Sequence, residues 1–276
     1  MPAAPGGPGS RNLVLRVAAA AVLVPLALVC AYVGSWLWTA IVTIAATGLY
    51  IEWLMVVGAS HEMPPALTGL LALLLIGGCL GFARPDAALL AAVLGLAAVA
   101  LLSSAHRVWT IAGLIYAGAA QFSAVLVRLD PEFGFAALTF VLLVVWATDS
   151  GGYFVGRRVG GPKLWPRVSP NKTWAGAVGG FVGSLAVAGA FAGMGFGRAL
   201  PLMVLSGVLS VAGQLGDLLE SAVKRRFGVK DSSRIIPGHG GLLDRLDSLV
   251  AALVLAAVLG LVRHGVDGIG RGLMVW

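Results

Sequence analysis

Carboxylates at helical spacing are the residues of this chain whose types and positions could do chemistry. Asp217 and Glu220 lie three residues apart, as do Asp244 and Asp247, so each pair would share one face of a helix. Both pairs border apolar segments, where carboxylates need partners, and like charges held close together need a cation or must take up protons. Oxygen ligands without a Cys/His cluster suit Mg²⁺ or Mn²⁺. The alternative is a salt-bridge network, such as Asp244 with Lys224.

Two polar stretches place basic residues and glycines beside these acids. In the first, Lys172 and Thr173 stand at an expected helix start, where phosphate can bind, although a helix cap also explains the Thr. In the second, His239-Gly240-Gly241 allows close approach to a ligand. The sequence has no GxxxxGK[ST], GxSxG or HExxH motif, which favours direct transfer between two bound substrates over a covalent enzyme intermediate.

The composition is that of an integral membrane protein. Of 276 residues, 59% are hydrophobic and only 11% are charged, and the long apolar runs exceed what a soluble domain could bury. The net charge of +7 is explained first by the excess of Lys and Arg in cytoplasmic loops. Cys30 and Cys79 lie in apolar runs and are predicted to pack rather than to form a disulfide.

Nine apolar segments are long enough to cross a bilayer. They cover about 13–34, 36–57, 66–83, 86–105, 108–128, 134–155, 174–196, 199–220 and 246–263. With the N-terminus in the cytoplasm, 14 of the 19 Lys and Arg residues fall on the cytoplasmic side. The sequence therefore predicts an all-α integral membrane protein of about nine transmembrane helices, with the N-terminus in the cytoplasm, the C-terminus outside and the active site at the cytoplasmic face.

The predicted organisation has four parts. A disordered N-terminal tail covers 1–12 and N-terminal transmembrane helices cover 13–133. A C-terminal catalytic transmembrane region covers 134–263, and a short tail covers 264–276. The catalytic region contains two cytoplasmic loops, 156–173 and 221–245.

The stretch from Ser221 to Asp247 resembles the signature of the phosphatidate cytidylyltransferases (CDP-diglyceride synthases). The matching positions are Ser221, Lys224-Arg225, Lys230-Asp231, Pro237, His239-Gly240-Gly241 and Asp244-Arg245-Leu246-Asp247. Upstream, the segments 149–157, 169–173 and 216–221 also resemble the family, and the strong resemblance covers about 145–250. Ala175 stands where the family often has an acid or Gln, so it is assigned no role.

The resemblance implies the reaction of CTP with phosphatidate to give CDP-diacylglycerol and pyrophosphate. It also implies a divalent cation such as Mg²⁺, a bacterial inner membrane, an active site facing the cytoplasm and a homodimer; no nucleic-acid partner is expected. The expected metal ligands are Asp217 and Asp244. The expected catalytic residues are Asp217, Asp244, Asp247, Lys224 and His239. The expected substrate-binding residues are Asp149, Lys172, Ser221, Arg225, Lys230, Asp231, Gly240, Gly241 and Arg245.

Other classes of function stay open. Intramembrane acids beside basic loops would also suit a transporter, although here the acids gather at one face instead of crossing the membrane. A polyprenol or phytol kinase would likewise bring a nucleotide and a lipid together. A purely structural scaffold is disfavoured, because so dense a run of charge beside apolar helices is costly to keep.

Overall fold

The computed structural model describes residues 25–233 and 240–276, and in these ranges eight helices are long and apolar enough to cross a membrane. They are α2 (Ser35–Val56), α3 (Met63–Gly81), α4 (Pro85–Leu102), α5 (Arg107–Leu129), α6 (Gly134–Val159), α7 (Trp174–Gly193), α8 (Ala199–Arg226) and α9 (Leu243–His264). Residues 25–33 are also helical, and the rest of the predicted first span lies outside the described residues. The prediction of a polytopic helical membrane protein is confirmed.

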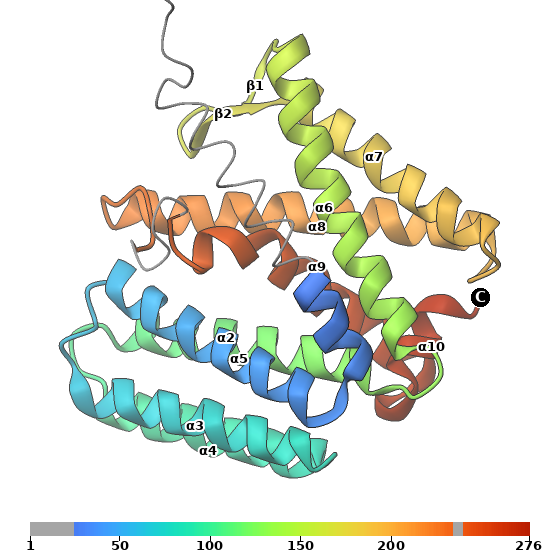
Figure 1. Ribbon diagram of the computed structural model, residues 1–276. Coiled ribbons are helices and arrows are strands. Elements are labelled where there is room, and N and C mark those ends of the chain that lie inside the picture. Colours follow the sequence, from blue (N-terminus) through green and yellow to red (C-terminus); the bar gives the residue numbers. More distant parts are fainter. Residues whose placement is uncertain (1–24, 234–239) are drawn as a thin grey trace, which may run out of the picture.

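The helices form an N-terminal and a C-terminal group that meet at α9 (Figure 1). In the N-terminal group, α3 and α4 pack on each other at the edge of the molecule, and α2 and α5 connect them to the rest. In the C-terminal group, α6 packs most extensively against α7, and α8 packs against α7 and α9. Because α9 also packs against α5 and α2, it contacts helices of both groups.

The connection between α6 and α7 is the main departure from an all-α fold. It contains two short antiparallel strands, β1 (Lys163–Trp165) and β2 (Ser169–Thr173), with Lys163 opposite Thr173. α6 is followed by Gly160, whose φ of 66° suits glycine. α7 begins with Thr173 as its cap, because Thr173 Oγ1 accepts a hydrogen bond from Gly176 N–H at 3.1 Å. The capping explanation for Thr173 therefore describes the structure.

Helix boundaries in the C-terminal half differ from those expected. α8 runs to Arg226, so Ser221, Lys224 and Arg225 of the expected loop 221–245 lie on a helix, and α9 begins at Leu243. This extension follows from tertiary packing, because its last turns bury Glu220 and Lys224. After α9 the chain forms a 3₁₀ turn (Val266–Gly268) and the short helix α10 (Ile269–Met274), whose apolar side chains are buried.

Glycines let α6 and α7 cross at backbone contact. A Cβ placed on Gly176 would lie 2.8 Å from Gly152 O, and one on Gly151 would lie 2.8 Å from Gly179 O. Small residues at this spacing allow helices to approach closely in a membrane. The close crossing fixes the part of α6 that carries Asp149 relative to the start of α7.

We expect Gly176→Ala to lower the stability of the protein by about 1–3 kcal/mol, because the new methyl group overlaps a backbone carbonyl that cannot move freely. Gly189→Ala on the same helix is the matched control, since a Cβ there meets nothing within 4 Å. The thermal unfolding midpoint of the purified protein in detergent measures both. Equal midpoints for the two variants would show that the crossing is not tight at Gly176.

Candidate active site

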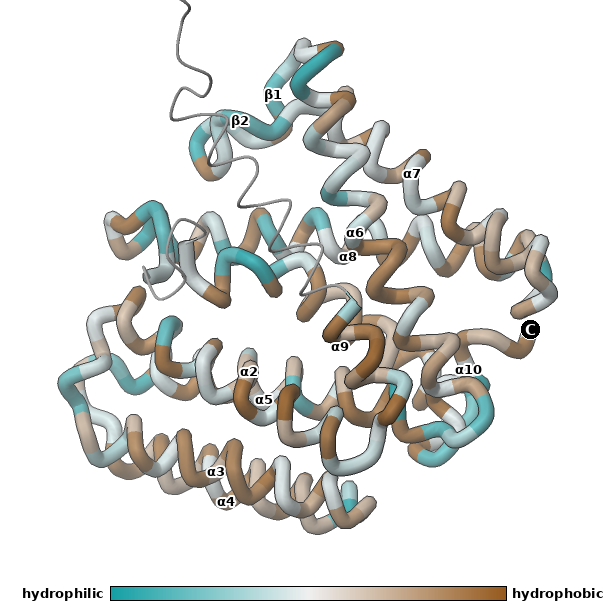
Figure 2. The backbone as a smooth tube through the Cα atoms, in the orientation of Figure 1, coloured by the Kyte–Doolittle hydropathy of each residue, from teal (hydrophilic) through white to brown (hydrophobic). Residues whose placement is uncertain are grey.

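A cavity of about 880 Å³ opens among α6, α7, α8, α9 and the β-hairpin. Polar segments gather at the C-terminal end of α6, at the hairpin and at the C-terminal end of α8, whereas α3 and α4 are mostly apolar (Figure 2). Among the residues that the structure describes, five carboxylates and five basic side chains line the cavity. They are Asp149, Asp217, Glu220, Asp244 and Asp247, with Arg157, Lys163, Lys172, Lys224 and Arg245.

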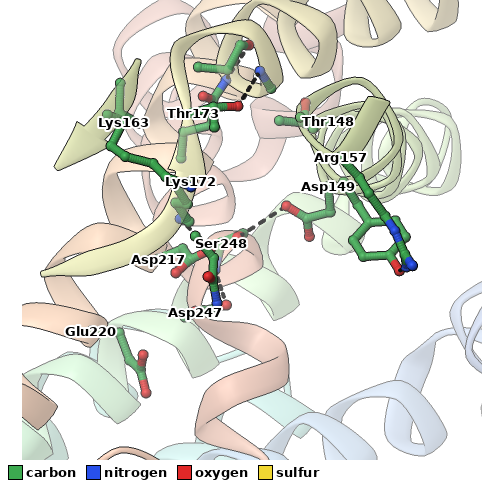
Figure 3. A pocket seen from close by; sticks show the side chains of 18 of the residues that line it. Thr148, Asp149, Arg157, Lys163, Lys172, Thr173, Asp217, Glu220, Asp247 and Ser248 are labelled. Atoms are coloured by element: carbon green, nitrogen blue, oxygen red, sulfur yellow. Dashed lines mark hydrogen bonds and ion pairs between the residues drawn. The ribbon is translucent and has the colours of Figure 1, made fainter. Parts of the chain in front are cut away.

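The carboxylates reach the cavity from three helices, with Asp149 on α6, Asp217 on α8 and Asp247 on α9 (Figure 3). Asp247 Oδ1 accepts a hydrogen bond from Ser248 N–H at 2.7 Å, and Ser248 Oγ lies 3.4 Å from Asp149 Oδ1. Asp217, Glu220, Asp244 and Asp247 all line the same cavity. The structure thus brings the two i, i+3 pairs of the sequence to one space, where their mutual repulsion favours a cation.

Two lysines already compensate part of this negative charge. Lys172 forms an ion pair with Asp217. Lys224 Nζ lies 2.5 Å from Asp244 Oδ1 and 2.8 Å from Glu220 Oε2. The salt bridge between Asp244 and Lys224, the alternative to a metal site, is therefore present. Each expected metal ligand is therefore paired with a lysine that is itself one of the expected site residues.

The loop after α8 folds over Asp244 and fixes its second oxygen. Asp244 Oδ2 accepts hydrogen bonds from Gly241 N–H at 2.9 Å and from Ser232 N–H at 3.1 Å, and the hydroxyl oxygen of Ser232 also lies 3.1 Å from it. Gly240 has a φ of 80°, in the left-handed region that favours glycine. A Cβ on Gly241 would overlap Ser232 Oγ and Glu52 Oε2. Both glycines of the expected binding segment therefore have a structural reason to be glycine.

The other expected substrate-binding residues are placed less centrally. Ser221 Oγ lies 3.4 Å from Asp217 Oδ1, just behind the cavity lining. Arg225, Lys230 and Asp231 are exposed and do not line the cavity. His239 lies outside the described residues.

Sequence reasoning missed two basic residues of the lining. Arg157 lies on the last turns of α6, where its Nη1 donates to Tyr153 Oη at 2.8 Å, and Lys163 comes from β1 (Figure 3). Arg157 lies in a segment that resembles the family, but where its side chain points depends on how far α6 continues. Lys163 reaches the cavity only because β1 pairs with β2. No local sequence pattern predicts this pairing.

The donor set suits Mg²⁺ in its chemistry, since the acidic groups supply oxygen ligands only. In the described part of the chain, no three His, Cys, Asp or Glu side chains are arranged to hold a metal ion by themselves. Mg²⁺ usually binds through one or two carboxylates together with substrate phosphates and water. The residues present therefore fit a cation that is completed by substrate.

Comparison with known proteins agrees with this chemistry. Residues 14–262 match the model of the Cytidylyltransferase family. A phosphatidate cytidylyltransferase of Brucella suis biovar 1 (strain 1330) is 52% identical over 158 residues, covering 56% of this chain and 57% of the relative. A protein of the same name from Bacillus subtilis (strain 168) is 45% identical over 141 residues, covering 49% and 51%. The aligned part of the chain spans about half the length of these curated relatives.

Proposed function

The chain belongs to the cytidylyltransferase family, and from this premise we propose that it transfers the cytidylyl group of CTP to phosphatidate, giving CDP-diacylglycerol and pyrophosphate. One observation carries the proposal. A single cavity in a helical membrane protein combines basic side chains suited to phosphates with carboxylates suited to Mg²⁺. A transporter or a lipid kinase is less well supported, because the family and the named relatives are cytidylyltransferases.

The reaction proposed is a direct displacement. A phosphate oxygen of phosphatidate attacks the α-phosphorus of CTP, the new P–O bond forms, and the bond to the β-phosphate oxygen breaks to release pyrophosphate. Such a reaction depends on positioning and charge neutralisation and needs no protein nucleophile. The acyl chains would stay in the bilayer while the headgroup reaches the cavity.

The lysine–carboxylate pairs suggest how the substrates are received. When phosphates enter, Lys172 and Lys224 exchange their carboxylate partners for phosphate oxygens. Asp217 and Asp244, released by this exchange, would hold Mg²⁺, with Asp247 and Asp149 beside them. Bound there, Mg²⁺ would neutralise charge on the phosphate oxygens and on the leaving group.

The remaining charged residues have supporting roles in the proposal. Arg157 and Lys163 extend the basic lining toward the hairpin, where they can receive the distal phosphates. Arg225 and Lys230 are exposed nearby and can attract anionic substrates, as can Arg245 on the lining. His239 is proposed to donate a hydrogen bond to a phosphate or to position its loop, and Asp231 and Ser221 to support the same region.

The proposal places the protein in a bacterial inner membrane, with its N-terminus and cavity on the cytoplasmic side and its C-terminus outside. The excess of Lys and Arg in the corresponding loops and the bacterial origin of the relatives support this orientation. A homodimer belongs to the proposal on family resemblance alone.

Labelled CTP tests the function directly. Purified protein in detergent micelles with phosphatidate and Mg²⁺ should transfer label from the α-phosphate and from cytosine into lipid, with release of unlabelled pyrophosphate. CTP labelled at the γ-phosphate should leave the lipid unlabelled. Transfer of γ-label into lipid would indicate a kinase instead, and no lipid product from either label would contradict enzymatic transfer. Reactions without phosphatidate are the blank.

A further inference from the structure

A buried carboxylate outside the cavity holds the loop that covers Asp244. Glu52, near the end of α2, is 0% exposed. Its Oε1 accepts hydrogen bonds from Ser233 Oγ at 2.7 Å and Leu242 N–H at 2.8 Å. Its Oε2 accepts from Ser232 Oγ at 2.8 Å and Leu243 N–H at 2.7 Å. All four donors come from the loop after α8 and the start of α9, about 180 to 190 residues away in the sequence.

These contacts make Glu52 the cap of α9. The first backbone N–H groups of a helix lack partners within it and favour negative charge. The residue at the capping position, Leu242, offers no side-chain hydrogen bond, so the carboxylate of a distant helix supplies it. Four donors compensate the cost of burying this charge away from water.

A serine connects Glu52 to the proposed site. Ser232 Oγ lies 2.8 Å from Glu52 Oε2 and 3.1 Å from Asp244 Oδ2, and Ser232 N–H also donates to Asp244. Asp244 in turn contacts Lys224. A continuous chain of hydrogen bonds and an ion pair therefore runs from α2 to the cavity lining.

We infer that Glu52 is a positioning residue for the proposed reaction: it fixes Ser232 and the first turn of α9 so that Asp244 and Lys224 face the cavity in the geometry that turnover needs. The inference rests on the proposed function. It requires a carboxylate in particular, because each oxygen accepts one backbone N–H. A glutamine would turn its NH₂ group toward one of these N–H groups in either orientation, and two donors cannot bond each other.

The competing explanation is that Glu52 only stabilises the fold as a helix cap. The value of kcat per folded molecule distinguishes this explanation from the positioning role. We expect Glu52→Gln to lower kcat for CDP-diacylglycerol formation about tenfold to a hundredfold, since displacements of about 1 Å at a reacting site have effects of this size. The KM for CTP should change less than about threefold, because the other basic side chains of the lining are untouched. The folded fraction is measured on the same samples by resistance to proteolysis.

Two further variants make the test specific. Ser232→Ala removes the connecting hydroxyl, and its effect on kcat should not add to that of Glu52→Gln in the double variant, because the two residues act through one network. Thr43→Val is the matched control on α2. Thr43 is buried and accepts a hydrogen bond from Gln121 at 2.9 Å, so its loss should lower the thermal midpoint but leave kcat unchanged.

The outcomes are distinct. Wild-type protein that forms no CDP-diacylglycerol overturns the proposed function and the inference with it. An active wild type together with Glu52→Gln at full kcat per folded molecule overturns the inference alone. If Glu52→Gln does not fold, Ser232→Ala decides: reduced kcat at near-normal stability supports the positioning role, and full kcat overturns it.

Discussion

The Asp217→Asn variant is expected to lose at least about a hundredfold in kcat while it stays folded in the membrane, an effect typical of removing one charged group from a reaction centre. The side chain of Asp217 is 29% exposed and its charged partner is Lys172, so an amide of the same shape is tolerated by folding. What the amide removes is the negative charge proposed to hold Mg²⁺ beside the phosphates. Initial rates of CDP-diacylglycerol formation at several Mg²⁺ concentrations give the measurement.

Two controls make this result specific to Asp217. Asp267→Asn, on the exposed 3₁₀ turn near the C-terminus, also removes one acidic charge and should leave turnover unchanged. The residual rate of Asp217→Asn should need more Mg²⁺ to reach half its maximum than the wild-type rate does. Near-normal turnover in Asp217→Asn, or an unaltered Mg²⁺ requirement, would exclude Asp217 as a metal ligand.

The Lys224→Met variant is expected to lose both stability and activity. Lys224 is 10% exposed and faces Glu220, whose side chain is 2% exposed, as well as Asp244. Methionine fills the space of the stem but leaves two enclosed carboxylates without their positive partner, which costs about 3–5 kcal/mol. The midpoint of thermal unfolding measures the loss, and Arg226→Met on the exposed end of α8 is the control, with a cost below about 1 kcal/mol.

A second substitution separates the two roles of Lys224. In Lys224→Met/Glu220→Gln one of the uncompensated charges is gone, so much of the lost stability should return. Activity should stay low, since the ammonium group proposed to receive a phosphate is still missing. Recovery of activity along with stability would mean that Lys224 serves only to neutralise Glu220 and Asp244.

The membrane spans were predictable because their signal is local. A run of about 20 apolar residues is visible in the sequence whatever its neighbours do. The end of α8 was not predictable in this way. From the sequence, Lys224 and Arg225 were predicted to lie in a polar loop. The carboxylates of Glu220 on α8 and Asp244 on α9 explain why Lys224 instead continues the helix and is buried. Tertiary partners outweighed the local preference.

The site residues likewise divide into those that a local signal predicts and those whose position depends on tertiary contacts. Asp217, Asp244 and Lys172 stood out because charged residues at membrane boundaries are rare and resemble a family pattern, and all three line the cavity. Lys163 gave no such signal, since a three-residue strand acquires its position only by pairing with β2. The role of Glu52 could not be predicted from the sequence, because its four donors lie far along the chain.

The equal numbers of acidic and basic side chains around the cavity have a consequence for how ligands load. The described residues of the lining are formally neutral together, so a dication alone would add uncompensated positive charge and a nucleotide alone would add uncompensated negative charge. Together they restore the balance, because the cation matches the carboxylates and the polyanion matches the bases. Each ligand should therefore raise the affinity for the other by the same factor, as thermodynamic linkage requires. Such cooperativity would keep the pocket from trapping either free magnesium or metal-free nucleotide.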